Sequence, residues 1–279
     1  EELSAQKNIS AKPTPEIEVD KARVRDLMKN CARISPSSLS DYVECGLKFF
    51  FKRIVKLSVE DEIKEEVDDR QLGSIYHGVM ETLYKVADGS KGTVLTRHFL
   101  KKAESEPQLT DVIMREFAKI MKNDDLRSEA DLGGRNILTF SVIKQLVKRT
   151  LQTEEPDTVV TATEQVVEMP MPLANGQELL LNGTIDRTHM LKSDDRLYVA
   201  DYKTGSASTK DSKNMTIKET ADLFDQAKHD DLKALMQVMT YCHILRHGLG
   251  MQGDMTPYVL FVRLLHTQDG GRSRRTAVN

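Results

Sequence analysis

The sequence predicts an α/β protein in which several helices precede a β-sheet. Up to Pro156, apolar residues recur with helical spacing, most clearly within 72–87. After Pro156 the residues from Val159 to Met169 alternate in polarity and are often β-branched, which is typical of a strand. A helix over 231–247 and a strand over 258–265 are expected to follow. The order is therefore helices, three strands, a helix and a strand.

The helical half divides at proline and serine signals. We expect residues 1–33 to form a linker or N-terminal extension with one short helix over 20–30, because Pro13 and Pro15 interrupt regular structure. The run Ser35-Pro36-Ser37-Ser38 supplies hydroxyl caps and predicts a helix over 37–52. The acid-rich residues 58–70 are expected to be a solvated loop. Further helices are expected over 72–87, 94–104, 109–122 and 134–153.

The sheet half contains three predicted strands, over 159–169, 179–191 and 197–203. Asn175-Gly176 is a strong hairpin signal between the first two, and Asp194-Asp195 turns the chain before the third. Residues 206–230 are polar and are expected to be a loop with some helix. With a flexible tail over 266–279, the folded domain is predicted to span 34–265.

Composition and charge exclude several classes of protein. The 279 residues are 39% hydrophobic and 30% charged, which is enough to bury a core. No run approaches about 18 uncharged apolar residues and no secretory leader is visible, so we expect neither a membrane nor a secreted protein. Cys31, Cys45 and Cys242 form no spaced framework, which fits a reducing cytoplasm. The net charge of −3 argues against a uniformly basic nucleic-acid coat.

Two carboxylates on neighbouring predicted strands are the first candidates for chemistry. Asp201 and Lys203 project from the same side of one strand, and pairing through the turn at 192–196 brings Asp186 close to Asp201. Adjacent carboxylates repel unless a cation lies between them, and oxygen ligands suit Mg²⁺ or Mn²⁺. Two interpretations remain open from these segments alone: a divalent cation site, or a polar rim held by Arg187 and Lys203.

Four further residues are ambiguous when each is considered alone. His77 lies on the amphipathic helix over 72–87, where a single histidine is more often packing or surface than a ligand. Glu164 lies in the middle of a predicted strand, where acids are depleted and an outward position would explain it. Gln237 and Tyr241 are four residues apart and so share one helix face.

Taken together and in order, these segments resemble a known family. The successive patterns are G-x-x-x-H, an acid in a strand, G-x-x-D-R, D-x-K-T-G and Q-x-x-x-Y, and residues 35–45 resemble its S-x-L-x-x-Y-x-x-C start. They resemble the RecB/AddB-type branch of the PD-(D/E)xK nuclease superfamily over about 34–265. The residues concerned are Gly73, His77, Glu164, Gly183, Asp186, Arg187, Asp201, Lys203, Thr204, Gly205, Gln237 and Tyr241.

The resemblance implies a restriction-endonuclease-like fold, in which helices flank a central mixed sheet behind an N-terminal helical extension. It also implies Mg²⁺- or Mn²⁺-dependent hydrolysis of DNA phosphodiester bonds by an exonuclease. Residue by residue, it assigns metal binding to Asp186, Asp201, the carbonyl of Tyr202 and His77. It places Lys203 near the attacking water, Glu164 behind a ligand or water, and Gln237 and Tyr241 as residues that shape the site.

The resemblance also suggests a biological setting. Domains of this branch often end a helicase–nuclease that repairs double-strand breaks by recombination, so DNA and a helicase region or subunit are the expected partners. The start at Glu1 rather than Met fits a piece of such a protein, and no Walker A motif is present. No iron–sulfur cluster is expected, because only Cys45 matches the four cysteines that some relatives use. The alternatives are a catalytically idle DNA-binding or scaffold module, or a stand-alone RecE-like or CRISPR-associated nuclease.

The basic residues are unevenly distributed. Residues 48–56 carry four cations without an acid, and Lys144, Lys148 and Arg149 mark another basic helix end. These segments are either solvated faces or the walls of a DNA groove.

Overall fold

The computed structural model describes residues 20–29, 33–57, 66–87, 89–174, 176–205, 217–266 and 275–277. Several predicted features lie outside these ranges: the linker over 1–19, most of the acid-rich segment, Asn175 of the hairpin turn, much of the loop over 206–230 and most of the tail over 266–279. Among the helices that are described, none combines the length and the apolar character needed to cross a membrane.

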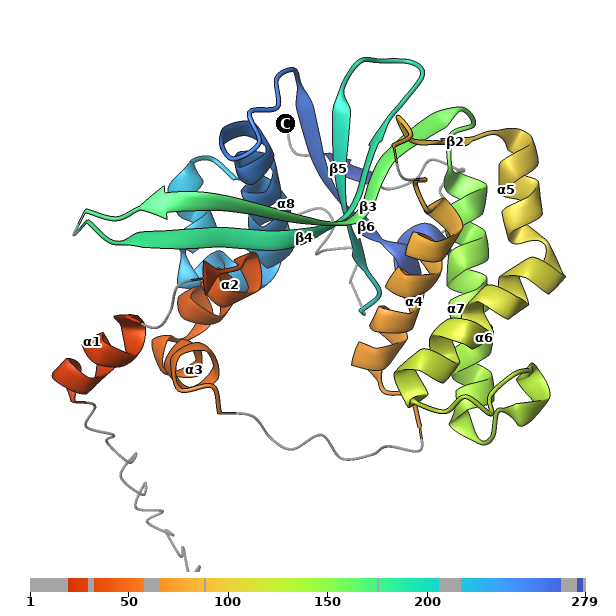
Figure 1. Ribbon diagram of the computed structural model, residues 1–279, viewed down its shortest axis with the longest axis horizontal. Helices are drawn as coiled ribbons and strands as arrows, with labels where there is room; N and C mark the ends of the chain where they lie inside the picture. Colours follow the sequence, from red (N-terminus) through yellow and green to blue (C-terminus); the bar gives the residue numbers. More distant parts are fainter. Residues whose placement is uncertain are drawn as a thin grey trace, which may run out of the picture.

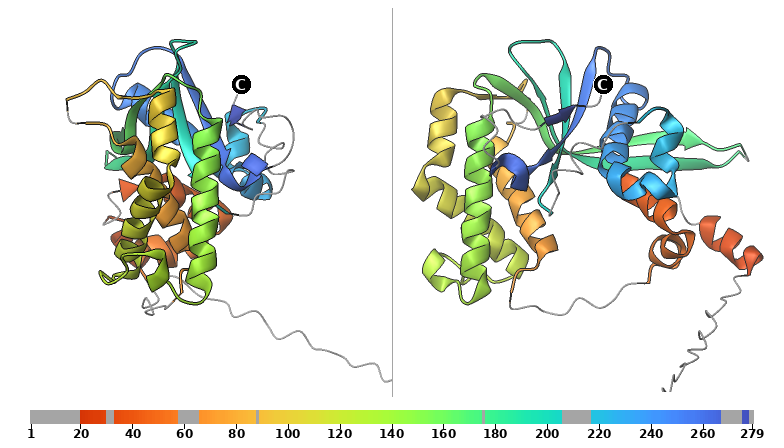
Figure 2. Two further views of the ribbon diagram at one scale, coloured as in Figure 1. Left: turned by 90° about the vertical axis from the view of Figure 1, so that its right-hand side faces the viewer. Right: turned by 180° about the vertical axis from the view of Figure 1, so that it is seen from behind.

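The helices flank the sheet on both sides (Figures 1 and 2). On one side lie α4 (Asp69–Tyr84), α5 (Arg97–Glu104), α6 (Glu106–Met121) and α7 (Arg135–Thr153). On the other side lie α2 (Pro36–Glu44) and α8 (His229–His247), with α1 (Lys21–Lys29) beyond them. Shorter elements are α3 (Gly46–Phe49), the π-helical η1 (Phe50–Ile54), and the 3₁₀ turns η2 (Glu129–Asp131), η3 (Thr220–Phe224), η4 (Gln226–Lys228) and η5 (Val262–His266).

The sheet is mixed, as the resemblance implies. Its main path runs β2 (Thr93–Leu95), β3 (Thr158–Pro172), β4 (Glu178–Met190), β5 (Leu197–Lys203), β6 (Met255–Phe261) and β7 (Arg275–Ala277), and β1 (Arg33–Ile34) adds to β4. The β5–β6 and β1–β4 pairs are parallel, and the other pairs are antiparallel. The restriction-endonuclease-like α/β architecture is therefore confirmed.

Side-chain caps mark the starts of α2 and α4. Ser35 accepts a hydrogen bond from the Ser38 N–H at the start of α2, and Asp68 forms a capping box with Gln71 at the start of α4. The prediction of one helix over 37–52 is wrong, because Cys45 is extended (φ −162°, ψ 117°) and separates α2 from α3. The Cys45 N–H closes α2 on Asp41, and its carbonyl accepts from Phe49 to begin the next turn.

Two strand predictions also need correction. The three-residue β2 was not expected, because so short a run carries no measurable alternation; it lies just before Thr96, which caps α5. The last strand was expected over 258–265, but β6 begins at Met255 and the chain turns into η5 after Phe261. The sequence did not indicate a strand start at Met255, because Pro257 follows it and proline is uncommon inside strands.

Two apolar layers fill the space on either side of the sheet. One joins α4, α6 and α7 to the sheet through Ile75, Val79, Ile113 and Phe140. The other packs α8 beneath the β3–β4 hairpin through residues such as Ile185 and Ile244. The site described below lies where the strands pass between these two layers.

A buried ion pair crosses the layer beneath α4. Arg187 on β4, only 1% exposed, places Nη1 2.6 Å from Glu154 Oε1 at the end of α7. Its Nη2 donates to the Tyr258 hydroxyl at 2.7 Å, and its guanidinium lies over the rings of Tyr84 and Tyr202. One side chain thus connects α4, α7, β4, β5 and β6.

Replacing Glu154 by Gln tests this pair. Because the substitution leaves a buried guanidinium without its counter-charge, we expect the free energy of unfolding to fall by about 3–5 kcal/mol in urea titrations. Asp157→Asn, which breaks the exposed pair with Lys192, should cost less than about 1 kcal/mol. Equal losses in the two variants would contradict the interpretation.

Candidate active site

The antiparallel pairing of β4 with β5 brings the two predicted aspartates together. Arg187 pairs with Ala200, so Asp186 and Asp201 come next along the same register. The Tyr202 N–H donates to Asp186 Oδ2 at 2.6 Å, which fixes that carboxylate against β5. Both aspartates are buried. The expected pairing through the turn at 192–196 is thus observed.

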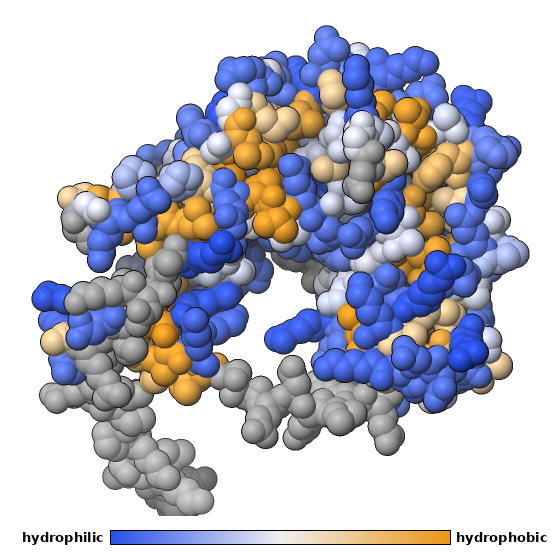
Figure 3. Space-filling model, in the orientation of Figure 1, coloured by the Kyte–Doolittle hydropathy of each residue, from blue (hydrophilic) through white to orange (hydrophobic). Residues whose placement is uncertain are grey.

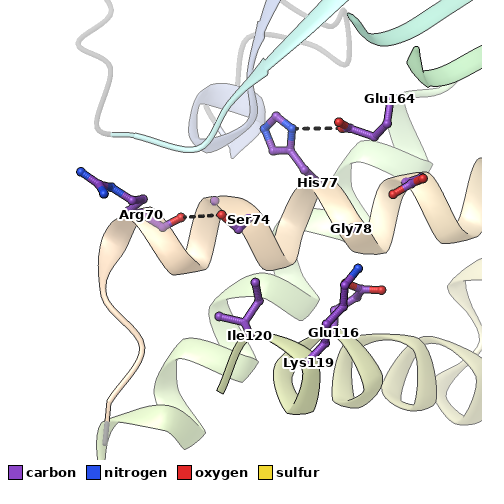
Figure 4. A pocket seen from close by; sticks show the side chains of 10 residues that line it. Arg70, Ser74, His77, Gly78, Glu116, Lys119, Ile120 and Glu164 are labelled. Atoms are coloured by element: carbon purple, nitrogen blue, oxygen red, sulfur yellow. Dashed lines mark hydrogen bonds and ion pairs between the residues drawn. The ribbon is translucent and has the colours of Figure 1, made fainter. Parts of the chain in front are cut away.

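Helix α4 brings His77 to the same place. Its Nδ1 lies 3.4 Å from Asp186 Oδ1 and 3.5 Å from Glu164 Oε1, and its Nε2 lies 3.2 Å from the Tyr202 carbonyl oxygen. Figure 4 shows His77 and Glu164 pointing toward each other from α4 and β3. One ligand atom from each of His77, Glu164 and Asp186 lies within 4.8 Å of the others, and these are the ligand types that hold a divalent cation.

Glu164 reaches this group from a strained backbone. Its φ is +44°, the left-handed region that a non-glycine residue seldom occupies within a strand. Its neighbours Thr163 and Gln165 pair with Arg187 and Ile185, so Glu164 lies across from Asp186. The resemblance implied a position for Glu164 behind a ligand, whereas its carboxylate lies in the cation-competent group itself. A strained residue at such a point is a common feature of functional sites.

Asp201 does not belong to that group of three. Instead, Lys203 Nζ lies 2.7 Å from Asp201 Oδ2 and donates to Gln237 Oε1 at 2.8 Å, and Gln237 Nε2 donates to the Tyr241 hydroxyl at 2.7 Å. Asp201 Oδ1 is buried and accepts no hydrogen bond from the part of the chain that the structure describes. All the candidate residues therefore converge, but they form two adjoining sets that share the β4–β5 edge.

Two glycines of the family's patterns allow close approaches. A Cβ on Gly183 would lie 2.6 Å from Tyr241 Cε1, so the ring can cover β4 only because that residue has no side chain. A Cβ on Gly73 would lie 2.9 Å from Thr204 Oγ1, where α4 meets the end of β5. These contacts explain why the chemistry-bearing residues are accompanied by glycine at these spacings.

Burial and neighbouring charges shift the pKa values of His77, Asp201 and Lys203. Burial lowers the pKa of His77, but hydrogen bonds to Asp186 and Glu164 outweigh it and raise that pKa to about 10. Burial raises the pKa of Asp201 to about 6, although Lys203 opposes the shift. Burial also lowers the pKa of Lys203, but Asp201 more than compensates and raises it above its ordinary value. Without a metal, the histidine and the lysine thus supply the positive charge that the carboxylates require.

Two alternatives from the sequence receive direct answers. Arg187 is not part of a polar rim, because it is buried against Glu154, a partner that no local sequence signal marks. Lys144 and Lys148 both pair with Glu106, and Lys144 also with Glu129, so acids neutralise these two lysines, which favours a solvated face over the wall of a DNA groove.

Fold and site together define a class of protein: a restriction-endonuclease-like domain with acidic residues and a lysine at the ends of adjacent central strands. The chain belongs to the PD-(D/E)XK nuclease superfamily, whose family model matches residues 33–278. It is also 25% identical, over 188 residues, to the B subunit of the ATP-dependent helicase/deoxyribonuclease of Carboxydothermus hydrogenoformans. That match covers 63% of this chain and 16% of the relative's length. The protein is therefore a nuclease of a metal-dependent superfamily.

The residues present fit a divalent cation. An imidazole and two carboxylates converge within bonding reach of one point, and the buried Asp201 Oδ1 adjoins them without a hydrogen-bond donor among the described residues. Oxygen-rich sets of this kind suit Mg²⁺ or Mn²⁺.

Proton release tests this site directly. His77 is protonated at neutral pH because its pKa is about 10, and a metal requires the neutral imidazole. We expect Mn²⁺ binding to release about one proton, and its affinity to rise about tenfold per pH unit between about pH 7 and 9. Calorimetry in buffers of different ionisation enthalpy measures this release. His77→Gln should abolish it, and a wild-type heat independent of the buffer would contradict the assignment.

Gly183→Ala tests the close approach of Tyr241. The added methyl group forces the ring off β4, so we expect the free energy of unfolding to fall by about 1–3 kcal/mol. The same substitution in a Tyr241→Ala background should cost almost nothing, because the clash is gone. Gly46→Ala is a matched control, since nothing lies near its Cβ position. Equal losses in both backgrounds would contradict the argument.

Proposed function

We propose that this protein is a Mg²⁺- or Mn²⁺-dependent deoxyribonuclease that acts as an exonuclease. The observation that carries the proposal is the convergence of His77, Glu164 and Asp186 beside the Asp201–Lys203 pair. A phosphodiester is an anion that resists attack by hydroxide, and a bound divalent cation neutralises it and lowers the pKa of bound water. Acidic side chains next to a cationic side chain on adjoining strands support the proposal, because this chemistry requires both.

The side chains divide the work by position. Asp186, His77 and Glu164 would hold the metal, with Asp201 and the Tyr202 carbonyl at its edge; the Tyr202 N–H keeps Asp186 oriented. Lys203 would stabilise the attacking hydroxide and the charge that develops on the phosphate. Gln237 holds Lys203 through its amide oxygen, and Tyr241 holds Gln237 in turn. These two residues position the lysine.

We also propose the bounds of the nuclease domain and its biological role. Residues 34–265 form the proposed nuclease unit, and similarity to a helicase/deoxyribonuclease subunit supports a role at the end of a cytoplasmic helicase–nuclease in double-strand break repair and recombination. DNA and a helicase region or subunit are the proposed partners.

Substitution of Asp201 and of Lys203 by Ala tests the function. Because each variant loses a group that acts on the reacting phosphate, we expect cleavage of linear DNA in Mn²⁺ to fall at least about 100-fold, with binding of DNA retained. Lys192→Ala, on the exposed turn between β4 and β5, is the matched control and should cut normally.

Two outcomes would refute the proposal or part of it. Metal-dependent cleavage that persists in both variants refutes the site. A wild-type protein that binds DNA and yields no product supports the idle-module alternative. Closed circular DNA separates the modes of attack, because an exonuclease leaves it intact while an endonuclease cuts it.

A further inference from the structure

A cationic cluster on the N-terminal helices is not used by the proposed chemistry. Lys48, Lys52 and Arg53 all surround the carboxylate of Asp41, whose side chain is 7% exposed. Lys52 Nζ lies 3.1 Å and Lys48 Nζ 3.4 Å from Oδ1, and Arg53 Nη2 lies 2.6 Å from Oδ2. We call the set of Asp41, Tyr42, Glu44, Lys48, Phe49, Lys52 and Arg53 the α2–η1 cluster.

The positive charges of the cluster outnumber its two carboxylates, Asp41 and Glu44. Lys48 is also paired with Glu44 at 2.7 Å, and Arg53 forms two short contacts with Asp41. One cation would neutralise Asp41, yet three converge on it, and the five ionised groups leave one positive charge in excess. Lys52 is 52% exposed and supplies that excess. Since like charges held close together repel, an incoming anion would be stabilised here.

A largely exposed aromatic ring follows Asp41 on the same helix. Tyr42 is 62% exposed, although its ring meets that of Phe49 edge-on with centroids 5.5 Å apart. Tyr42 follows Asp41 directly and its partner Phe49 follows Lys48, so the ring and the cations come from the same short helical segments. An open tyrosine face offers stacking to an unpaired base, and bases within a duplex are already stacked.

The cluster is joined to the candidate active site through α2. Pro36, the first residue of α2, would lie 3.5 Å from a Cβ on Gly183, three residues before Asp186 on β4. At about 1.5 Å per residue, Asp41 lies about 8 Å along the helix from that contact. Figure 3 shows the molecule hollowed between the part that carries α2 and α3 and the part that carries α4 and α6, and β5 ends between them (Figure 1).

We propose that the α2–η1 cluster is a binding site for single-stranded nucleic acid, in which Lys52 and Arg53 hold one phosphate and Tyr42 stacks on an adjacent unpaired base. The inference deepens the proposed nuclease function and rests on it for the identity of the substrate. Asp41 holds the cations in place before the strand arrives, which reduces the side-chain entropy lost on binding. The site selects for a single strand because only an unpaired base can reach the ring.

Binding in the absence of metal tests this proposal. We would measure fluorescence anisotropy in EDTA, where the metal-dependent site is inactive, with labelled oligo-dT and a blunt duplex of equal length. Tyr42→Ala should weaken oligo-dT binding about 5- to 10-fold and leave duplex binding unchanged, whereas Tyr42→Phe should retain it. Lys52→Gln should remove one phosphate contact. The slope of log K against log salt concentration for single-strand binding should therefore become less steep by about 0.7.

Matched controls come from the opposite side of the molecule. Leu138→Ala on α7 and Lys101→Gln on α5 alter an exposed apolar and an exposed basic residue, and neither should change oligo-dT affinity. Circular dichroism and thermal unfolding of Tyr42→Ala should match the parent, because the ring is largely exposed.

The binding measurements test the α2–η1 cluster separately from the proposed nuclease function. If Tyr42→Ala binds oligo-dT as tightly as the parent, the proposal is overturned and a protein-docking role for this surface is favoured instead. An equal loss for oligo-dT and duplex overturns strand selection. Cleavage by the wild-type protein in Mn²⁺ is measured on the same oligonucleotides. A protein that does not cleave them contradicts the proposed nuclease function, and the binding comparison still tests the α2–η1 cluster.

Discussion

The buried pair of Arg187 with Glu154 is the contact on which the active end of the sheet depends. Because side chains on a strand alternate, the residue after Asp186 must enter the opposite layer, and there Arg187 meets Glu154, Tyr258, Tyr84 and Tyr202. Removing two charges from water is costly, and the arrangement persists only because hydrogen bonds and aromatic faces surround the guanidinium. The same strand thus presents a carboxylate to one side and is anchored on the other, so the carboxylate cannot shift without disturbing the core.

The Arg187–Glu154 pair stabilises a site whose buried carboxylates and strained backbone are themselves unfavourable for folding. Buried carboxylates repel one another, Glu164 occupies left-handed backbone, and the pKa of Asp201 rises to about 6 because its charge is poorly solvated. His77 and Lys203 offset part of this cost, since each carries a proton while the carboxylates are ionised. The balance explains why the site combines acids with two basic groups: the positive charges of His77 and Lys203 offset the repulsion between the buried carboxylates.

The strands and the convergence of the site could be predicted from the sequence, because those depend on local signals. Alternation predicted β3, turn residues separated the strands that follow it, and the ordered patterns that resemble the nuclease family singled out His77, Asp186 and Lys203 as candidates. What failed depends on tertiary contacts. The break at Cys45 follows from one extended residue, and Pro257 lies inside a parallel pair where propensity argues against it. The position of Glu164 follows from a backbone outlier, and Glu154 is identified as a partner of Arg187 only when α7 is packed against the sheet.

The distribution of charge reconciles an acidic chain with a polyanionic substrate. In the group of His77, Glu164 and Asp186, two carboxylates face one imidazole, so this group would repel phosphate in the absence of a bound cation. Acids already neutralise Lys144 and Lys148 on the outer helices, whereas the cations around Asp41 retain an excess charge. A net charge of −3 therefore does not oppose DNA binding; it requires that attraction be local. A surface with one excess charge and one exposed ring would by itself supply only modest affinity for a strand.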